Sequence, residues 1–170
     1  MINQEQLDIS RQKYRNYINM HVYKVQESWK EIKDKISICK DIPELIPLID
    51  SQIMAHDNAK FDPAEFESYR RKFYPVNDED KISQNEFDIA VNHHYYNSPH
   101  HPEYYQMHPE YDVIDNKRIA YTIEMICDWM ACGKDHGNTA LEWYNSNGEK
   151  FNFRPEIKDI AEKTLHEIYD

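Results

Sequence analysis

Apolar residues recur every three or four positions along most of this chain, the period of an amphipathic α-helix. One stripe predicts a first helix from Gln4 to about Lys35, and a second stripe follows Pro43. The members are, in order, Tyr14, Ile18, His21, Val25, Trp29 and Ile32, and then Leu45, Ile49, Ile53 and His56. Each stripe therefore includes a histidine at an inward-facing position. A core histidine bonded to a backbone carbonyl would also fit His21.

Capping signals mark two further helices. Asp62 precedes Pro63 and can cap a short helix from Ala64 to about Phe73. Ser83 and Glu86 have the spacing of a capping box. The helix that this box opens carries Phe87, Ala90, Val91 and His94 along one side. We therefore expect His94, rather than His93, to point inward, and both remain candidates for the site.

A strongly apolar helix is predicted from Asn116 to about Gly133, with Gly133 as its C-cap. Glu124 and Asp128 stand four residues apart on one face of this helix. A buried carboxylate needs a cation partner. A salt bridge to Arg118 would provide one, and a metal ion is the sharper alternative, which we favour for Asp128. Helices at 138–147 and 155–169 complete the pattern.

These elements predict an all-α protein: a single-domain bundle of about six or seven helices over residues 1–170. Three glycines leave little material for the tight turns of a β-rich fold. A formal net charge of -11 argues against binding to duplex nucleic acid or an anionic membrane. The three cysteines show no CxxC spacing, and no long apolar run or signal segment is present. We expect reduced thiols and a cytoplasmic protein.

Candidate chemistry is concentrated in histidines and acids. His56 and Asp57 are adjacent at the end of the second stripe, and imidazole and carboxylate can converge on one divalent cation. If the helix continued, Lys60 would lie on the same face and suit an anionic substrate such as a phosphate. Five of the nine histidines fall within sixteen positions: His93, His94, His100, His101 and His108. A surface cluster without a role is the plain alternative for these.

The order His21, His56-Asp57, Asp128 has the form H…HD…D. It resembles the HD-domain superfamily of metal-dependent phosphohydrolases, with spacings close to those of the small 5′-deoxynucleotidases. Lys60 resembles the HDxxK form of the cyclic-dinucleotide phosphodiesterase branch. The runs around Lys60-Phe61, Asn92-His93-His94, Pro99-His100-His101 and Asp128-Trp129 are also similar to an uncharacterised family common in phage and bacterial genomes.

This resemblance implies that His21, His56, Asp57 and Asp128 coordinate one divalent metal, namely manganese, cobalt, nickel, iron or zinc. Open positions on such an ion let a bound water lose a proton near neutral pH and attack phosphorus. Lys60 would neutralise phosphate charge in the transition state.

Proton transfer is assigned to Glu124 or to one of His93 and His94. In superfamily members with two metals, further histidines hold the second ion. His93, His94, His100 and His101 are the candidates for a second metal or for substrate, with His94 and His101 preferred. The small deoxynucleotidases carry an acid where this chain has Lys60, so their monophosphate specificity does not transfer.

The leading hypothesis is a metal-dependent phosphohydrolase acting on a nucleotide or another small phosphate ester. A di-iron oxygenase resembling myo-inositol oxygenase is the second, because two irons require about six protein ligands. A non-catalytic, metal-binding interaction protein is the third. The aromatic content would also allow a homodimer surface.

Overall fold

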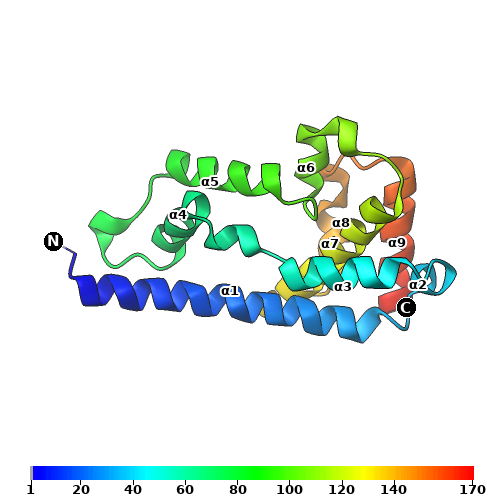
Figure 1. The fold of residues 1–170 in the computed structure, drawn as a ribbon, viewed down its shortest axis with the longest axis horizontal. Helices are drawn as coiled ribbons and strands as arrows, with labels where there is room; N and C mark the ends of the chain where they lie inside the picture. Colours follow the sequence, from blue (N-terminus) through cyan, green and yellow to red (C-terminus); the bar gives the residue numbers. More distant parts are fainter. Residues whose placement is uncertain (1) are drawn as a thin grey trace. The chain divides into compact units, whose positions relative to one another are not determined.

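The computed structural model describes residues 2–170, and all regular secondary structure in this part of the chain is helical (Figure 1). The all-α prediction is therefore confirmed. Within those residues there are nine α-helices and no strands. They are α1 (Gln4–Ile32), α2 (Ser37–Asp41), α3 (Leu45–Ala55), α4 (Pro63–Phe73), α5 (Gln84–Asn97), α6 (Pro102–Met107), α7 (Asn116–His136), α8 (Ala140–Asn147) and α9 (Pro155–Tyr169). Four short 3₁₀ turns connect them: η1 (Asn58–Phe61), η2 (Asp78–Asp80), η3 (Pro109–Tyr111) and η4 (Gly148–Lys150).

Seven of these helices correspond to the predicted ones. The two additional helices, α2 and α6, have five and six residues. A helix of that length covers fewer than two turns, so its sequence is too short to display a 3.6-residue period.

The helix ends test the capping predictions. The Asp62 side chain accepts a hydrogen bond from Ala64 N, and the Ser83–Glu86 capping box is complete. Gly133 as the C-cap of α7 was wrong, because that helix continues to His136 and ends at Gly137 with φ 74°. A Cβ atom at Gly133 would lie 2.5 Å from the Asn138 carbonyl oxygen. The chain thus needs glycine there for close approach of the backbone, and the left-handed cap comes one turn later.

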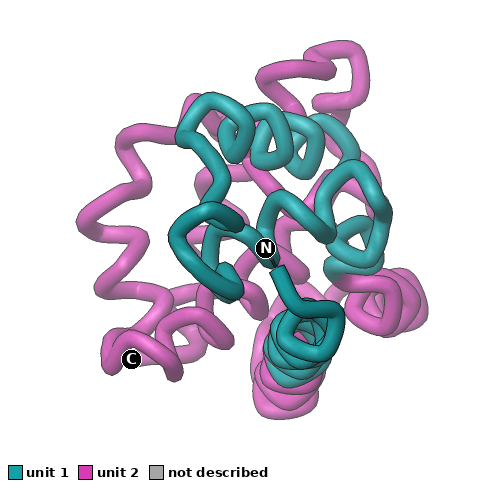
Figure 2. Tube along the Cα trace, turned by 90° about the vertical axis from the view of Figure 1, so that its left-hand side faces the viewer, with its two compact units in different colours: residues 1–20, 57–98 teal, residues 21–56, 99–170 magenta. Residues whose placement is uncertain are grey.

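The chain divides into two compact units, coloured separately in Figure 2. Unit 1 comprises residues 1–20 and 57–98, and unit 2 comprises residues 21–56 and 99–170. Helix α1 contributes residues to both. The single-domain assignment stays a prediction.

Unit 2 contains the larger apolar core. Helices α3 and α9 both pack against α7, which supplies buried residues along most of its length. Val25, Trp29 and Ile32 of α1 reach this core with 3% exposure or less, as the first stripe predicted. Leu45, Ile49 and Ile53 of α3 do the same, so the second stripe is confirmed as well.

Unit 1 is built on aromatic contacts between α1, α4 and α5. The Tyr14 and Phe66 rings lie 5.1 Å apart, and Tyr69 meets Phe87 edge-on at 5.1 Å. Arg70 is buried in this unit and forms a two-point salt bridge with Asp80, at 2.5 and 2.9 Å. Such a fork fixes the η2 turn against α4.

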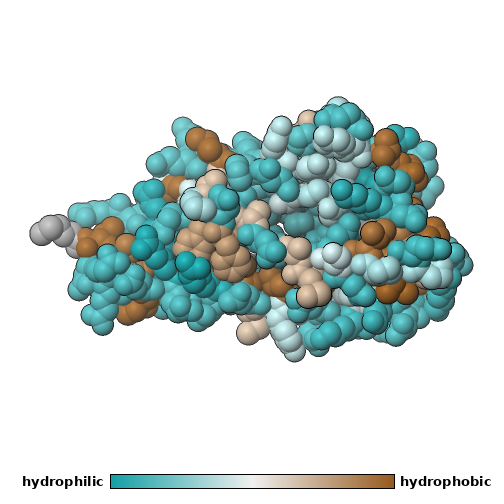
Figure 3. Space-filling view, viewed as in Figure 1, coloured by the Kyte–Doolittle hydropathy of each residue, from teal (hydrophilic) through white to brown (hydrophobic). Residues whose placement is uncertain are grey.

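Hydrophilic side chains predominate on the face drawn in Figure 3, in keeping with a charged fraction of 30%. Across residues 2–170, none of the helices combines the length and the hydrophobicity needed to cross a membrane.

Candidate metal centre

The candidate centre in unit 2 is built from helices distant in sequence. His21 lies on α1, His56 is the residue directly after α3, and Asp128 lies on α7. Because α3 packs along α7, the end of α3 places His56 beside the middle of α7. His21 and His56 are 7% and 2% exposed, and the Asp128 side chain is 13% exposed. The centre therefore excludes most water while keeping an opening at Asp128.

Three donor atoms converge there. His21 Nε2 lies 3.0 Å from Asp128 Oδ1 and 3.3 Å from His56 Nε2, and His56 Nε2 lies 3.8 Å from the same carboxylate oxygen. Ligands at about 2.0–2.2 Å from one ion are separated by about 2.8–3.1 Å at octahedral angles and about 3.3–3.6 Å at tetrahedral angles. The separations of 3.0 and 3.3 Å match these values, and the 3.8 Å between His56 Nε2 and Asp128 Oδ1 is slightly wider. Two imidazoles and one carboxylate are also a ligand set that divalent transition metals accept. With a small adjustment of that third pair, this donor triangle fits one such ion.

Glu124 contacts His56 at the ring nitrogen that faces away from the triangle. Its Oε1 lies 2.8 Å from His56 Nδ1, and Glu124 is 2% exposed. An ionised Glu124 carboxylate would accept a hydrogen bond from His56 Nδ1, which leaves the lone pair of His56 Nε2 for the triangle. A carboxylate bonded to the far nitrogen of a metal-binding histidine is the usual supporting arrangement. The contact favours an orienting role for Glu124, and its catalytic assignment stays a prediction.

His100, His101 and Cys132 lie around the same set. The centre of the His100 ring lies 4.4 Å from that of His56, with 43° between the two planes, and His100 Nδ1 lies 3.5 Å from Glu124 Oε1. The His101 ring follows at 4.3 Å from His100. Cys132, one turn after Asp128, has its Sγ 3.6 Å from Asp128 Oδ1. His56, His100 and Asp128 can each offer one ligand atom within 4.8 Å of the others.

The electrostatics keep Asp128 ionised. Burial by itself raises the pKa of this carboxyl group. The hydrogen bond from His21 and the nearby imidazoles of His56 and His100 outweigh burial and hold the pKa well below its usual range. A metal site needs this ionised carboxylate together with neutral imidazoles, so an ion bound here would displace the proton that His21 Nε2 donates to Asp128.

Unit 1 contains the remaining predicted residues. Asp57 has a left-handed backbone (φ 58°), so α3 does not continue through it and Lys60 reaches it from η1. The expectation that Lys60 shares a helical face with His56 and Asp57 was therefore wrong. Lys60 Nζ donates to Asp57 Oδ2 at 2.6 Å all the same. The 3₁₀ turn brings together two side chains that a helix would also have paired.

His93 and His94 lie on α5 and share one buried acid, Glu65 of α4. Glu65 is fully buried and its two oxygens lie 2.8 Å from His93 Nδ1 and 2.9 Å from His94 Nδ1. His94 is 2% exposed, whereas the His93 side chain is 41% exposed, so the predicted orientation of this pair is confirmed. His94 Nε2 faces Asp57 Oδ1 at 3.4 Å.

Sequence reasoning missed Glu65, Cys132 and the true partner of Arg118. Glu65 occupies an ordinary position in the first turn of α4, and only the packing of α4 against α5 reveals its partners. Arg118 donates to Asp112 Oδ1 at 3.0 Å, and Glu124 instead faces His56. The salt bridge considered for Glu124 therefore goes elsewhere. A signal for Cys132 was present in its spacing of four from Asp128.

The fold and site thus define an all-α protein whose unit 2 carries a histidine–aspartate donor cluster, the triangle of His21, His56 and Asp128. A family model described as a family of unknown function (DUF5662) matches residues 10–169, so the chain belongs to that family. None of the curated proteins and none of the solved structures matched the chain. Membership of the HD-domain superfamily stays a prediction from the motif.

Proposed function

We propose that the protein is a metal-dependent phosphohydrolase acting on a nucleotide or another small phosphate ester. The observation that carries the proposal is the convergence of His21 Nε2, His56 Nε2 and Asp128 Oδ1 within 3.0–3.8 Å. Three protein ligands with further positions open are typical of catalytic metal sites, whereas structural sites are closed by four.

Each residue of the set has a defined task. His21, His56 and Asp128 would hold the ion, and the Glu124 carboxylate keeps the His56 ring in the tautomer that exposes Nε2. Manganese, cobalt, nickel, iron or zinc would supply an acidified water and polarise the phosphoryl group. The Asp128 side chain is 13% exposed, so a phosphate would approach the ion from that side.

The proposed roles of Asp57 and Lys60 come from the sequence motif. The resemblance assigns Asp57 as a fourth ligand and Lys60 as the cation for the phosphate, and both roles stay predictions. Their 2.6 Å contact in unit 1 supports a coupled role, because Lys60 would have to exchange Asp57 for phosphate oxygen. The cytoplasmic setting belongs to the same proposal and is supported by three free cysteines.

A di-iron oxygenase is the second candidate. It is favoured by His100, whose ring centre lies 4.4 Å from that of His56 and which could add a further ligand beside His56 and Asp128. Two irons per chain, with oxygen consumption and without phosphate release, would select this alternative. A non-catalytic interaction protein would show neither activity.

The test is hydrolysis of a panel of phosphate esters. Nucleoside mono-, di- and triphosphates, cyclic dinucleotides and p-nitrophenyl phosphate are offered to chelator-treated protein with each of the five metals. Asp128→Asn is compared with Asp135→Asn, the same change on the same helix at a residue that pairs with Lys24. Metal-dependent phosphate release lost only in Asp128→Asn supports the proposal. Release by neither wild type nor variants, or equal release by both variants, overturns it.

A further inference from the structure

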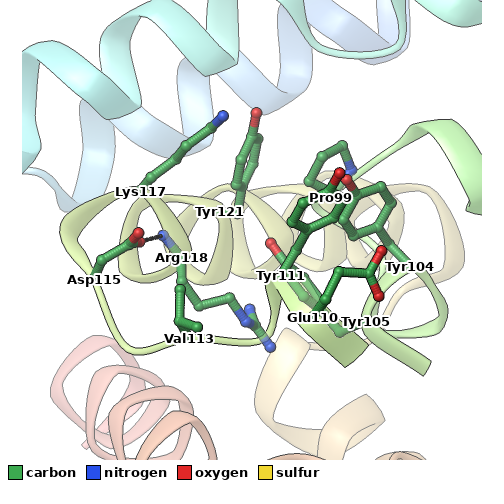
Figure 4. A pocket seen from close by; sticks show the side chains of 10 residues that line it. All are labelled: Pro99, Tyr104, Tyr105, Glu110, Tyr111, Val113, Asp115, Lys117, Arg118 and Tyr121. Atoms are coloured by element: carbon green, nitrogen blue, oxygen red, sulfur yellow. Dashed lines mark hydrogen bonds between the residues drawn. The ribbon is translucent and has the colours of Figure 1, made fainter. Parts of the chain in front are cut away.

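Unit 2 also contains a pocket that the donor cluster does not use (Figure 4). It has a volume of about 480 Å³ and is formed by Pro99, α6, η3 and the first turns of α7. That volume lies within the range of pockets that hold small molecules, about 300–1,000 Å³.

Tyrosines dominate the pocket lining. Tyr105 is buried at its floor, Tyr104 and Tyr121 are half-buried, and Tyr111 is exposed at its rim. The Tyr104 and Tyr111 rings stack on each other, with 6.3 Å between their centres and 17° between their planes, so their outer faces are the ones open to a ligand. The pocket therefore offers flat aromatic faces at several depths, which suits a flat ring that can stack on them.

The charges of the pocket are balanced and mostly fixed by the protein. The Arg118 guanidinium lies 3.6 Å from the Tyr105 ring centre and donates to Asp112 and Thr122, so it stiffens the floor. Asp115 caps α7 through the backbone N–H of Arg118, drawn as the dashed line in Figure 4. Lys117 projects on the same side of α7 as Tyr121, and its ammonium lies 6.0 Å from that ring.

A polyanion is disfavoured by this balance. Glu110 and Asp115 offset Lys117 and Arg118 among the lining residues. An uncharged aromatic ring with N–H groups fits better, because its faces can stack on tyrosine and its edge can donate to a carboxylate or a phenol oxygen.

The pocket adjoins the donor cluster along the chain. Tyr121 lies on α7 one turn before Glu124, so the two side chains are neighbours on the helix surface. Pro99 directly precedes His100. Burial, and next the Glu124 charge, raise the pKa of the Tyr121 phenol.

We propose that this tyrosine pocket binds the base of the substrate, so that the substrate is a nucleotide whose phosphate lies at the neighbouring donor cluster. This inference rests on the proposed function for the phosphate, and it selects nucleotides among the phosphate esters. Stacking on tyrosine tolerates every base, so the pocket recognises a nucleobase as a class.

Binding of nucleosides tests the pocket without any hydrolysis. Adenosine, guanosine, cytidine and uridine are titrated by calorimetry into chelator-treated protein. Wild type should bind at least one of them, and Tyr111→Ala should weaken that binding on the order of tenfold or more. Tyr111→Phe, which keeps the ring, should restore it. Tyr23→Ala is the control, because Tyr23 is 53% exposed, close to the 55% of Tyr111, and lies outside the pocket.

Two results would overturn the pocket assignment: no nucleoside bound by wild type up to its solubility limit, or equal binding by wild type and Tyr111→Ala. The phosphate-release panel separates this failure from failure of the proposed function. Phosphate release without nucleoside binding would overturn the pocket assignment and leave the proposed function standing. Nucleoside binding that responds to Tyr111→Ala, without hydrolysis, supports the pocket and removes the phosphohydrolase assignment.

Discussion

Both units contain a buried glutamate bonded to a histidine, yet the two arrangements differ in what surrounds the imidazole. In unit 2, Glu124 holds His56 at 2.8 Å, and the far nitrogen of His56 meets His21 and Asp128. In unit 1, Glu65 holds His94 at 2.9 Å and serves His93 as well.

The difference lies in the cation. The far nitrogen of His94 faces Asp57, whose other oxygen already accepts from the Lys60 ammonium. Unit 1 therefore carries its own positive charge beside the carboxylates, whereas the unit 2 triangle joins imidazoles to an ionised aspartate. The same carboxylate–imidazole pair can build either a self-neutralising network or a cation site, and the neighbouring charges select between them.

The largest expected effect is on catalysis through the unit 2 triangle. His21→Ala removes one of three converging donors, so metal-dependent phosphate release should fall to the level without enzyme. Release is measured by a colorimetric phosphate assay at saturating metal. His93→Ala, which removes an exposed imidazole of unit 1, is the comparison and should retain a larger share of activity. Equal loss of phosphate release in both variants would show that catalysis depends no more on the unit 2 triangle than on the exposed imidazole of unit 1.

The next effect is on stability and is confined to unit 1. Arg70→Ala leaves Asp80 buried without its two-point partner, which should lower the free energy of unfolding by about 3–5 kcal/mol. Urea denaturation followed by circular dichroism measures the change. A loss below about 1 kcal/mol, the level of a surface pair, would show that the bridge is not buried in solution.

A third prediction compares the two glutamates directly. Glu124→Gln replaces the acceptor behind His56, so the affinity for manganese or zinc should fall about 10–100-fold. Glu65→Gln is the same change in the other unit and should leave that affinity within about twofold. Calorimetric titration of chelator-treated protein gives both dissociation constants. A larger loss for Glu65→Gln would place the metal in unit 1.

The smallest effect is the pH dependence of unit 1. The hydrogen bond from Arg70, opposed by burial, lowers the pKa of Asp80. A lowered folded-state pKa stabilises the protein above the unfolded value, about 3.9, and this contribution is lost as the pH falls below it. The difference in stability between wild type and Asp80→Asn should therefore be full at pH 6–7 and shrink below about pH 4. A difference independent of pH between 7 and 3 would contradict it.

Seven of the nine helices, and the inward direction of His21 and His56, were predictable because both follow from local period. His21 and His56 stand in apolar stripes whose phase fixes their direction, and Asp128 stands on a helix that its apolar residues define. The backbone at Asp57 was not predictable. A left-handed aspartate carries no periodic signal, and it redirected the segment that holds Lys60.

Pairings between distant elements were also beyond the sequence. Glu65 and Arg70 are ordinary polar residues on α4, and their partners on α5 and η2 are chosen by tertiary packing. The same holds for the tyrosine pocket, where Tyr105 and Tyr121 come from two helices whose contact no local pattern announces.

The most direct test of the account is elemental analysis of protein purified without chelator or affinity-tag metal, beside a His21→Ala/His56→Ala double variant. The account predicts at least one manganese, cobalt, nickel, iron or zinc ion per chain in the wild type and its loss in the variant. Wild type that stays free of metal after incubation with all five, or a double variant that keeps its metal, would contradict the assignment of the unit 2 triangle as a metal centre.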